Sequence, residues 1–553
     1  MVRLLTRKVY RKTLTSIVAS IQPAISRDSL LEMVQSGVTV FRINFSWYDS
    51  APPDAWRKKL EEIDSIARKE GLVLGIMLDT KGPEFRVRDL SDDAVAVNPD
   101  TQGYIYPPGQ NITLTLDPSQ KTNSNTIAIT APPKTQFKTP GSRVVFGDGD
   151  YETVIQSRSN DGNSMVLKSD KPLVVWERAK VNFPRTSVTA SALSEEDTEI
   201  IRFFLQEGKG LDKRVNFMFA QSFIKCVEDV DRLIHLLQHG MKETNIDNPI
   251  VIAKLETFES SRPENLHKII ERSSAVMIAR GDLANETSRQ EVPQLQRDII
   301  KVAKQYNKPV LLATQVYASM ANPTRYNCTR PEAEDVRSAL ELGVDGFVLT
   351  GETTARPKDP EKVVAALASQ IWKDELDLIK DSDREPSENH YERLREAERK
   401  AFHNKMRKQM RDPYLPIEAQ RWLGTTDFAI AAVFRANTYG AIGLFPFTQG
   451  GATVREMSRF YPETEIYPVT GSPETAQSLL LCRCTHPILV EVTDYPLEQF
   501  YIDRFKDLVR RIVGELNLRA RRPHARYAIC TMAHPPLQPG GADTLLRIRI
   551  DES

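Results

Sequence analysis

Short runs of Val, Ile, Leu and Phe recur along the chain from about residue 15, and most are followed by a segment whose apolar residues repeat at helical spacing. Eight of these runs are predicted to be strands: Thr15–Ile21, Thr39–Phe45, Leu72–Asp79, Val215–Ile224, Ile250–Glu256, Ala275–Ala279, Pro309–Thr314 and Gly346–Leu349. Eight strands that alternate with helices are typical of a parallel sheet closed on itself. The pattern therefore predicts an α/β fold, the (β/α)8 TIM barrel.

The alternation stops between about Arg86 and Lys180. Here β-prone runs such as "NITLTL", "SRVVFGDGD" and "SMVLKS" alternate with turn-forming Gly, Pro, Asn and Asp. This stretch predicts an all-β domain that is inserted after the third barrel strand.

A strongly charged, apolar-poor stretch follows Trp372. We interpret it as a solvated helical linker, with a partner-binding segment as the alternative. From Thr425 onward the alternation resumes, with "AIGLFPF", "EIYPVTG", "PILVEV" and "YAICTM" as predicted strands of a C-terminal α/β domain. The expected segments are barrel 1–85, inserted β-domain 86–180, barrel 181–375, linker 376–415 and C-terminal domain 416–553.

The composition narrows the possible functions. The chain has 553 residues with 74 basic and 74 acidic side chains, so no net field would draw it to nucleic acid or anionic lipid. No apolar run is long enough to span a bilayer, and "MVRLLTRKVYRKTLT" does not read as a secretory signal. We expect a cytoplasmic protein. The alternative is that the basic N-terminal stretch is a mitochondrial targeting signal. Five cysteines, an odd number, indicate a reducing compartment.

Cys482, Cys484 and His486 lie close together in the sequence. They lack a second ligand pair at zinc spacing, so we interpret them as packing residues.

In a barrel of this kind the functional side chains lie where the strands end. The second predicted strand carries Arg42, Asn44 and Ser46 on one face, because alternate residues of a strand point the same way. The third predicted strand ends in Asp79, and three more polar or charged residues follow it: Thr80, Glu84 and Arg86.

The fifth predicted strand ends in Lys254 and Glu256. Asp282 follows the sixth strand, and Thr314 ends the seventh. Two carboxylates at neighbouring strand ends repel each other unless a cation lies between them, and hard oxygen ligands suit Mg2+. Lys254 and the arginines would add the positive charge that phosphoryl transfer needs. The alternatives are a structural Lys254–Glu256 ion pair, threonines that cap strand ends, and Asp282 as a helix N-cap.

Nine runs resemble the motifs of the pyruvate kinase family, in the family's order and roughly its spacing: "TSIVASIQPA", "FRINFS", "LDTKGPEFR", "KVNFPRTSVTASALSEED", "AKLET", "MIARGDLANE", "LLATQVYASM", "TRPEAEDV" and "LTGETTARPKDP". The resemblance covers nearly the whole chain. It implies that the inserted β-domain is a lid and that the protein transfers a phosphoryl group from phosphoenolpyruvate to ADP, giving ATP and, after protonation of the enolate, pyruvate. It also implies a homotetramer.

The resemblance implies roles for single residues. Glu256 and Asp282 would hold Mg2+ (or Mn2+), and Lys254 would stabilise charge on the phosphoryl group in flight. Arg42 and Arg86 would bind the transferred phosphate and the nucleotide phosphates.

The other implied roles concern potassium and the enolate. Thr314 would lie near the enolate carbon, and the amides of Gly281 and Asp282 near the substrate carboxylate. Glu84 occupies a position associated with potassium dependence, and the K+ ligands would be Asn44, Ser46, Asp79 and Thr80.

Several positions depart from the family pattern. Trp47 replaces a histidine, Gln22 replaces a glycine, and Ala179 replaces a lysine, with Lys180 one place later. Two milder departures are Ala284 for glycine and Thr350 for serine. These changes leave open a divergent paralogue that binds ligands without efficient turnover and has a regulatory role. An aldolase-like enzyme is the third alternative, but it would need neither a lid nor potassium-type residues.

The stretch "FTQGGATVREMSRFYP" resembles the family loop that binds fructose 1,6-bisphosphate. Thr448, Gly451 and Thr453 persist, but Gln449 and Ala452 remove positive charge that some members have. We predict weak or absent activation by this sugar phosphate in a rate assay. A loop-dependent activation of about tenfold or more, which is within the usual range of allosteric coupling, would refute the prediction.

Overall fold

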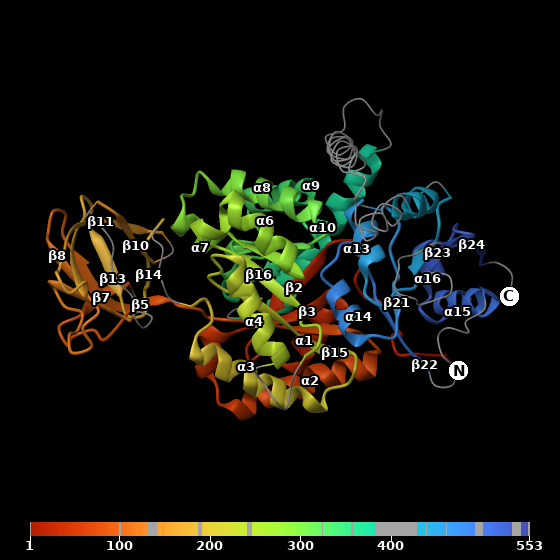
Figure 1. The fold of residues 1–553 in the computed structure, drawn as a ribbon, viewed down its shortest axis with the longest axis horizontal. Helices are drawn as coiled ribbons and strands as arrows, with labels where there is room; N and C mark the ends of the chain where they lie inside the picture. Colours follow the sequence, from red (N-terminus) through yellow and green to blue (C-terminus); the bar gives the residue numbers. More distant parts are fainter. Residues whose placement is uncertain are drawn as a thin grey trace, which may run out of the picture.

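The computed structural model describes residues 2–98, 101–130, 141–147, 149–185, 191–239, 246–322, 324–355, 359–382, 428–437, 439–460, 462–492, 502–532 and 544–550. The predicted linker lies outside these residues from 383 onward. Figure 1 shows an elongated molecule with an all-β domain at one end, a barrel in the middle and a second α/β domain at the other end.

The central domain is a closed barrel of eight parallel strands. In spatial order they are β2 (Ser16–Ser20), β3 (Val38–Asn44), β4 (Leu74–Asp79), β15 (Val215–Gln221), β16 (Val251–Leu255), β17 (Ala275–Ala279), β18 (Val310–Ala313) and β19 (Gly346–Leu349). All eight coincide with predicted runs, so the TIM-barrel prediction is confirmed.

The helices of the barrel domain surround the strands (Figure 1). They are α1 (Arg27–Gln35), α2 (Pro53–Glu70), α3 (Glu195–Glu207), α4 (Val227–His239), α5 (Phe258–Ser261), α6 (Pro263–Arg272), α7 (Arg280–Glu286), α8 (Val292–Gln305), α9 (Arg330–Leu342) and α10 (Pro360–Ser382). Helix ends follow local chemistry. The Ser26 hydroxyl accepts the amide of Ser29 at the start of α1, and Gly37, with φ of 111°, follows its end.

The strands alternate between two cores. Phe41 and Ile43 of β3 pack outward against the helices, whereas Val40 belongs to the cluster inside the barrel. Arg42 and Asn44 follow Val40 at a period of two, so they point inward at the carboxyl end. The same alternation turns Lys254 and Glu256 of the β16 segment inward, because Ile252 is interior and Ala253 exterior.

The inserted domain is itself a closed β-barrel. Its strands are β5 (Phe85–Val87), β8 (Ile112–Thr115), β9 (Thr126–Thr130), β10 (Arg143–Phe146), β11 (Tyr151–Arg158), β12 (Ser164–Lys168) and β14 (Lys180–Asn182). A three-stranded sheet of β6 (Val95–Asn98), β7 (Thr101–Tyr106) and β13 (Leu173–Trp176) accompanies it. The chain enters this domain after β4 and leaves it after β14, and we call it the lid.

The C-terminal domain has two small sheets. One contains β20 (Leu444–Pro446), β23 (Tyr527–Met532) and β24 (Thr544–Arg549), and the other β1 (Val2–Leu4), β22 (Ile488–Val492) and β21 (Val469–Thr470). The named helices here are α13 (Ala452–Arg459), α14 (Pro473–Leu479), α15 (Ile502–Glu515) and α16 (Leu518–Arg521). The four strands predicted here are present, and β1 and β24 are additional. Within the described part of the chain, no helix is long and apolar enough to cross a membrane.

Candidate active site at the mouth of the barrel

A buried network of charges lies inside the barrel at the carboxyl ends of its strands. The Lys254 ammonium donates to the hydroxyl of Ser222 at 2.6 Å and lies 3.1 Å from Asp79 Oδ1 and 3.3 Å from Glu256 Oε2. Arg42 Nε donates to the other oxygen of Asp79 at 2.6 Å. Asp79 is thus held between two cations, and its side chain is fully buried.

Burial and charge act against each other in this network. Burial alone would raise the pKa of Asp79, but Arg42 and Lys254 hold it below its usual value. Burial would likewise lower the pKa of Lys254, whereas Asp79 and Glu256 keep it raised. The ammonium therefore stays charged, and fixed charge in a water-poor site acts more strongly than in water.

Glu256 is the carboxylate with unused bonding capacity. Its Oε1 accepts the amide of Phe223 at 2.7 Å, but its Oε2 is buried without a hydrogen-bond partner. Burial raises the pKa of Glu256 to about 7. This Oε2 oxygen, which has the Lys254 ammonium at 3.3 Å but accepts no hydrogen bond, and a second carboxylate, Asp282, fit the oxygen chemistry of a divalent cation, so the residues present match that group.

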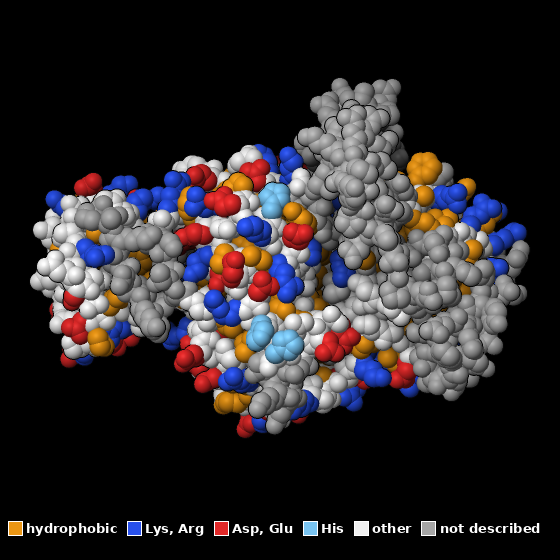
Figure 2. Space-filling model, viewed as in Figure 1, with side chains coloured by type: hydrophobic (Ala, Val, Ile, Leu, Met, Phe, Trp, Pro, Cys, Tyr) orange, Lys and Arg blue, Asp and Glu red, His pale blue; other side chains and the backbone are white. Residues whose placement is uncertain are grey.

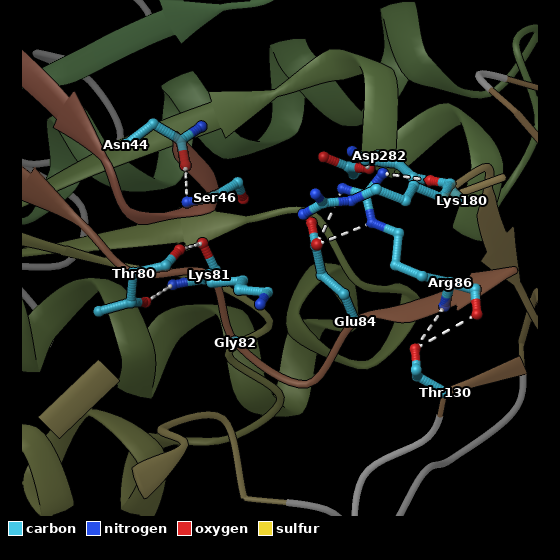
Figure 3. Close-up of polar contacts among 12 residues, drawn as sticks. Asn44, Ser46, Thr80, Lys81, Gly82, Glu84, Arg86, Thr130, Lys180 and Asp282 are labelled. Carbon is cyan, nitrogen blue, oxygen red and sulfur yellow. Dashed lines mark hydrogen bonds and ion pairs between the residues drawn. The ribbon is translucent and has the colours of Figure 1, made fainter. Parts of the chain in front are cut away.

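Asp282 lies in the first turn of α7, whose N-cap is Ala279, so the alternative of Asp282 as the N-cap is wrong. Its Oδ1 accepts a hydrogen bond from the ammonium of Lys180 at 2.9 Å. Figure 3 shows Lys180 reaching Asp282, with Glu84 and Arg86 close by. Burial opposes the ionised form, but Lys180 is the main cause that holds the pKa of Asp282 below its ordinary value.

Arg86 binds Glu84 rather than pointing freely into the cleft. Its Nε and a terminal nitrogen donate to Glu84 Oε2 at 2.9 and 2.8 Å, and another nitrogen donates to the Arg178 carbonyl at 3.0 Å. Residues of both the lid and the barrel, among them Glu84, Lys180, Asp282 and Glu286, line a cleft between the two domains.

Thr314 has a backbone that a β-branched residue rarely adopts, with φ of 69°. Its hydroxyl accepts the amide of Gly281 at 2.8 Å and donates to the carbonyl of Ala313 at 2.6 Å. Thr314 therefore joins the end of β18 to the start of α7, and strain of this kind is concentrated at functional sites.

The residues predicted to bind potassium lie together. Asn44 and Asp79 are register partners on adjacent strands, and Thr80 follows directly. The amide oxygen of Asn44 accepts the backbone amide of Ser46 at 2.9 Å, as Figure 3 shows. Amide, hydroxyl and carboxylate oxygens are a donor set that suits a hard cation.

Two of the departures from the family pattern have visible consequences. The Trp47 ring lies against Gly351, where a Cβ atom would come within 1.7 Å of the ring, so only glycine leaves room for it. Ala179 is buried, and Lys180 carries the ammonium that reaches the site instead.

Ser222 is a residue of this charge network that the sequence pattern did not identify as a site residue. Its hydroxyl donates to the Thr80 carbonyl at 2.5 Å and accepts from Lys254, and its amide donates to the Thr80 hydroxyl at 2.9 Å. It continues the inward alternation of Met218 and Ala220 at the end of β15. Applying the strand-end argument to this fourth strand would have found it.

Glu286, like Glu256, is a buried acid whose pKa is raised. Burial raises its pKa to about 8, and Asn182 of the lid donates to its Oε1 at 3.4 Å.

Glu286→Gln is expected to change the pH dependence of stability. Between about pH 4.5 and pH 8 the folded protein keeps a proton on Glu286 that the unfolded chain has lost, so wild-type stability falls as pH rises through this range. The variant should unfold several degrees higher than wild type at about pH 9 and at nearly the same temperature at about pH 5. Scanning calorimetry of both proteins measures this, and equal midpoints at high pH would contradict the assignment.

The fold and the site together define a class: a TIM barrel with an inserted β-lid and a lysine–carboxylate site at the carboxyl ends of its strands. The family model "Pyruvate kinase, barrel domain" matches residues 11–364, and "Pyruvate kinase, alpha/beta domain" matches residues 427–546. The chain belongs to the pyruvate kinase family.

Named relatives agree with this membership. Pyruvate kinase 2 of Synechocystis sp. is 29% identical over 478 residues, covering 86% of this chain and 70% of that protein. Pyruvate kinase of Corynebacterium glutamicum is 33% identical over 355 residues, covering 64% of this chain and 68% of that protein. Pyruvate kinase PKLR of Homo sapiens is 28% identical over 509 residues, covering 90% and 78%.

Proposed function

We propose that the protein transfers the phosphoryl group of phosphoenolpyruvate to ADP. The P–O bond to the enol oxygen breaks, a terminal oxygen of ADP forms the new P–O bond, and a proton adds to the enolate carbon to give pyruvate. The observation that carries the proposal is the Lys254 ammonium, buried between Asp79 and Glu256 at the mouth of the barrel. Family membership supports it.

The residues of the chain have distinct tasks in this proposal. Lys254 stabilises negative charge on the phosphoryl group during transfer, because it is a fixed cation in a buried site. Arg42 and Arg86 bind the transferred phosphate and the nucleotide phosphates. Thr314 lies near the enolate carbon and guides its protonation through water, and the amides of Gly281 and Asp282 bind the substrate carboxylate.

Glu256 and Asp282 would hold Mg2+ or Mn2+. The bound ion would neutralise charge on the phosphoryl oxygens. The Oε2 atom of Glu256 supports this assignment, because it is buried and accepts no hydrogen bond, with only the Lys254 ammonium nearby at 3.3 Å.

Potassium would bind the cluster of Asn44, Ser46, Asp79 and Thr80. The register pairing of Asn44 with Asp79 on adjacent strands supports this potassium site. Glu84 also supports it, because it occupies the position that the family resemblance associates with potassium dependence. A cytoplasmic location and a homotetrameric assembly complete the proposal and rest on the family resemblance.

A catalytically weak paralogue with a regulatory ligand-binding role is the second candidate. The observation that favours it is Trp47, whose ring fills the space above Gly351 next to the barrel mouth. In that case phosphoenolpyruvate or a nucleotide would bind without efficient turnover.

An assay of pyruvate formation from phosphoenolpyruvate and ADP, with Mg2+ and with or without K+, separates the two candidates. The proposed function predicts turnover that requires Mg2+ and rises with K+. Substrate binding by calorimetry without pyruvate formation in any of these conditions would favour the regulatory paralogue and refute the transferase.

A further inference from the structure

Strand β15 ends in a turn that contacts two charged groups of the neighbouring β16 segment. Charged side chains of both signs are interspersed over the visible surface of the barrel domain (Figure 2), whereas the groups at this turn are buried. Ser222 is 1% exposed, and its hydroxyl accepts a hydrogen bond from the Lys254 ammonium at 2.6 Å. The amide of the next residue, Phe223, donates to Glu256 Oε1 at 2.7 Å. Two consecutive residues of one turn therefore hold Lys254 and Glu256.

The partners of the Ser222 hydroxyl determine the direction of its hydrogen bonds. An ammonium can only donate, so the serine oxygen accepts from Lys254. The single hydroxyl proton then goes to the Thr80 carbonyl at 2.5 Å, since Asp79 Oδ1 lies farther away at 3.3 Å. The ammonium itself is closer to this hydroxyl than to Asp79 or Glu256, which lie at 3.1 and 3.3 Å. Ser222 is thus the nearest of the three partners of the ammonium.

Ser222 is anchored where the hydrogen-bond ladder between β4 and β15 ends. These parallel strands pair Asp79 with Ala220, and the Thr80 amide donates to the Ala220 carbonyl at 2.9 Å. The next bond of a regular parallel ladder would join the Ser222 amide to the Thr80 carbonyl. Instead, the amide donates to the Thr80 hydroxyl at 2.9 Å, and the Ser222 hydroxyl donates to the carbonyl. Side chains replace the last ladder bond, so Ser222 is attached to Thr80 at two points.

The backbone of the turn is in an unusual conformation next to these contacts. Phe223 has φ of 53°, in the left-handed region that a bulky residue rarely adopts. Gly82 packs on the turn so closely that a Cβ atom there would lie 2.7 Å from the Phe223 ring and 3.3 Å from the Ser222 Cβ. Such a conformation persists only where surrounding contacts fix the backbone, and it is typical of functional sites. The turn is therefore a rigid support for the groups that it holds.

We propose that Ser222 is a positioning residue whose hydroxyl holds the Lys254 ammonium where the phosphoryl group is transferred. The hydroxyl is buried and its hydrogen bonds run to Lys254 and Thr80, so it acts through Lys254 rather than on the substrate. Without it the ammonium would move toward Asp79 and Glu256, its remaining partners. The inference rests on the proposed function for the task of Lys254, but the hold on the ammonium does not depend on that task.

The first test is the turnover number of Ser222→Ala in the assay of pyruvate formation. It should fall about thirtyfold, the effect of losing a hydrogen bond to a charged group, while the KM for phosphoenolpyruvate changes less than about threefold. Ser273→Ala is the matched control. Ser273 is also 1% exposed and donates its hydroxyl to the Ile269 carbonyl at 2.7 Å, but it precedes β17 at the opposite end of the barrel. Its replacement should change the turnover number less than about twofold.

A double-mutant cycle tests whether Ser222 acts through Lys254. In Lys254→Met the hydroxyl has no ammonium to hold, so adding Ser222→Ala should lower the turnover number less than about twofold further. A further loss as large as in the wild-type background would overturn the proposal. So would a turnover number of folded Ser222→Ala within about twofold of wild type. Circular dichroism establishes that each variant is folded.

Acetylation of lysines by acetic anhydride, followed by mass spectrometry of the peptides, tests the hold on the ammonium without any turnover. Loss of the Ser222 hydroxyl removes a partner that favours the charged amine, so Lys254 should be acetylated about threefold or more faster in Ser222→Ala than in wild type. Lys81 in the same samples should be acetylated at an unchanged rate. An unchanged rate at Lys254 would overturn the inference. If wild type forms no pyruvate but the rate at Lys254 responds to Ser222→Ala, the proposed function fails and the hold of Ser222 on the ammonium stands.

Discussion

Replacement of Lys254 by methionine is expected to lower the turnover number for pyruvate formation by about a thousandfold. Methionine keeps most of the volume of the side chain but removes the charge that lies between Asp79, Glu256 and Ser222. The effect should appear in the turnover number more than in the KM, because the charge is needed most when the phosphoryl group is in transit. Steady-state kinetics with both substrates varied measures this.

The matched control for this variant is Lys81→Met. Lys81 lies just after β4, but its ammonium pairs with Glu196 at 3.1 Å, outside the buried network. Its loss should change the turnover number by less than about twofold, as expected for an exposed pair. If the two variants lose the turnover number to the same extent, Lys254 acts only through the net charge or the stability of the protein.

Replacement of Glu256 by glutamine is expected to weaken binding of Mn2+ by at least about a hundredfold. The side chains have nearly the same shape, so the change tests the charge of Oε2, the buried oxygen without a hydrogen-bond partner. Titration calorimetry with Mn2+ at a pH above 7 measures this, because burial raises the pKa of Glu256 to about 7 and a proton would otherwise compete.

Glu259→Gln serves as the control for that measurement. Glu259 lines the same cleft between the lid and the barrel, but it lies on α5 beyond the mouth of the barrel. Its replacement should leave Mn2+ affinity within about threefold of wild type, the effect expected of a distant charge. If Glu256→Gln binds Mn2+ as tightly as this control, Glu256 is not a metal ligand.

The sequence predicted the barrel because its signal is local. Each strand is a short apolar run followed by a helix with readable ends, and period-two alternation alone turns Arg42 and Asn44 inward with Val40. Once the barrel is assumed, the carboxyl ends of all strands meet, and Lys254 comes near Asp79 although 175 residues separate them in the sequence.

The features that were missed depend on three-dimensional contact. Lys180 reaches Asp282 across 102 positions and between two domains, and no periodicity indicates the direction of a lid side chain. Trp47 packs on Gly351 because the turn after β3 and the turn after β19 lie at the same end of the barrel, where β2 alone separates the two strands. Strand β1 has three residues, and its pairing with β22 depends on tertiary contact rather than on its own pattern.

The central claim is transfer of a phosphoryl group from phosphoenolpyruvate to ADP at Lys254. Phosphorus NMR of the protein with both substrates, Mg2+ and K+ tests it directly, since it follows the fate of the phosphorus atom. The account predicts that the phosphoenolpyruvate signal is replaced by the γ-phosphate signal of ATP in wild type and persists in Lys254→Met. Unchanged substrate in both proteins, or release of inorganic phosphate without ATP, would contradict it.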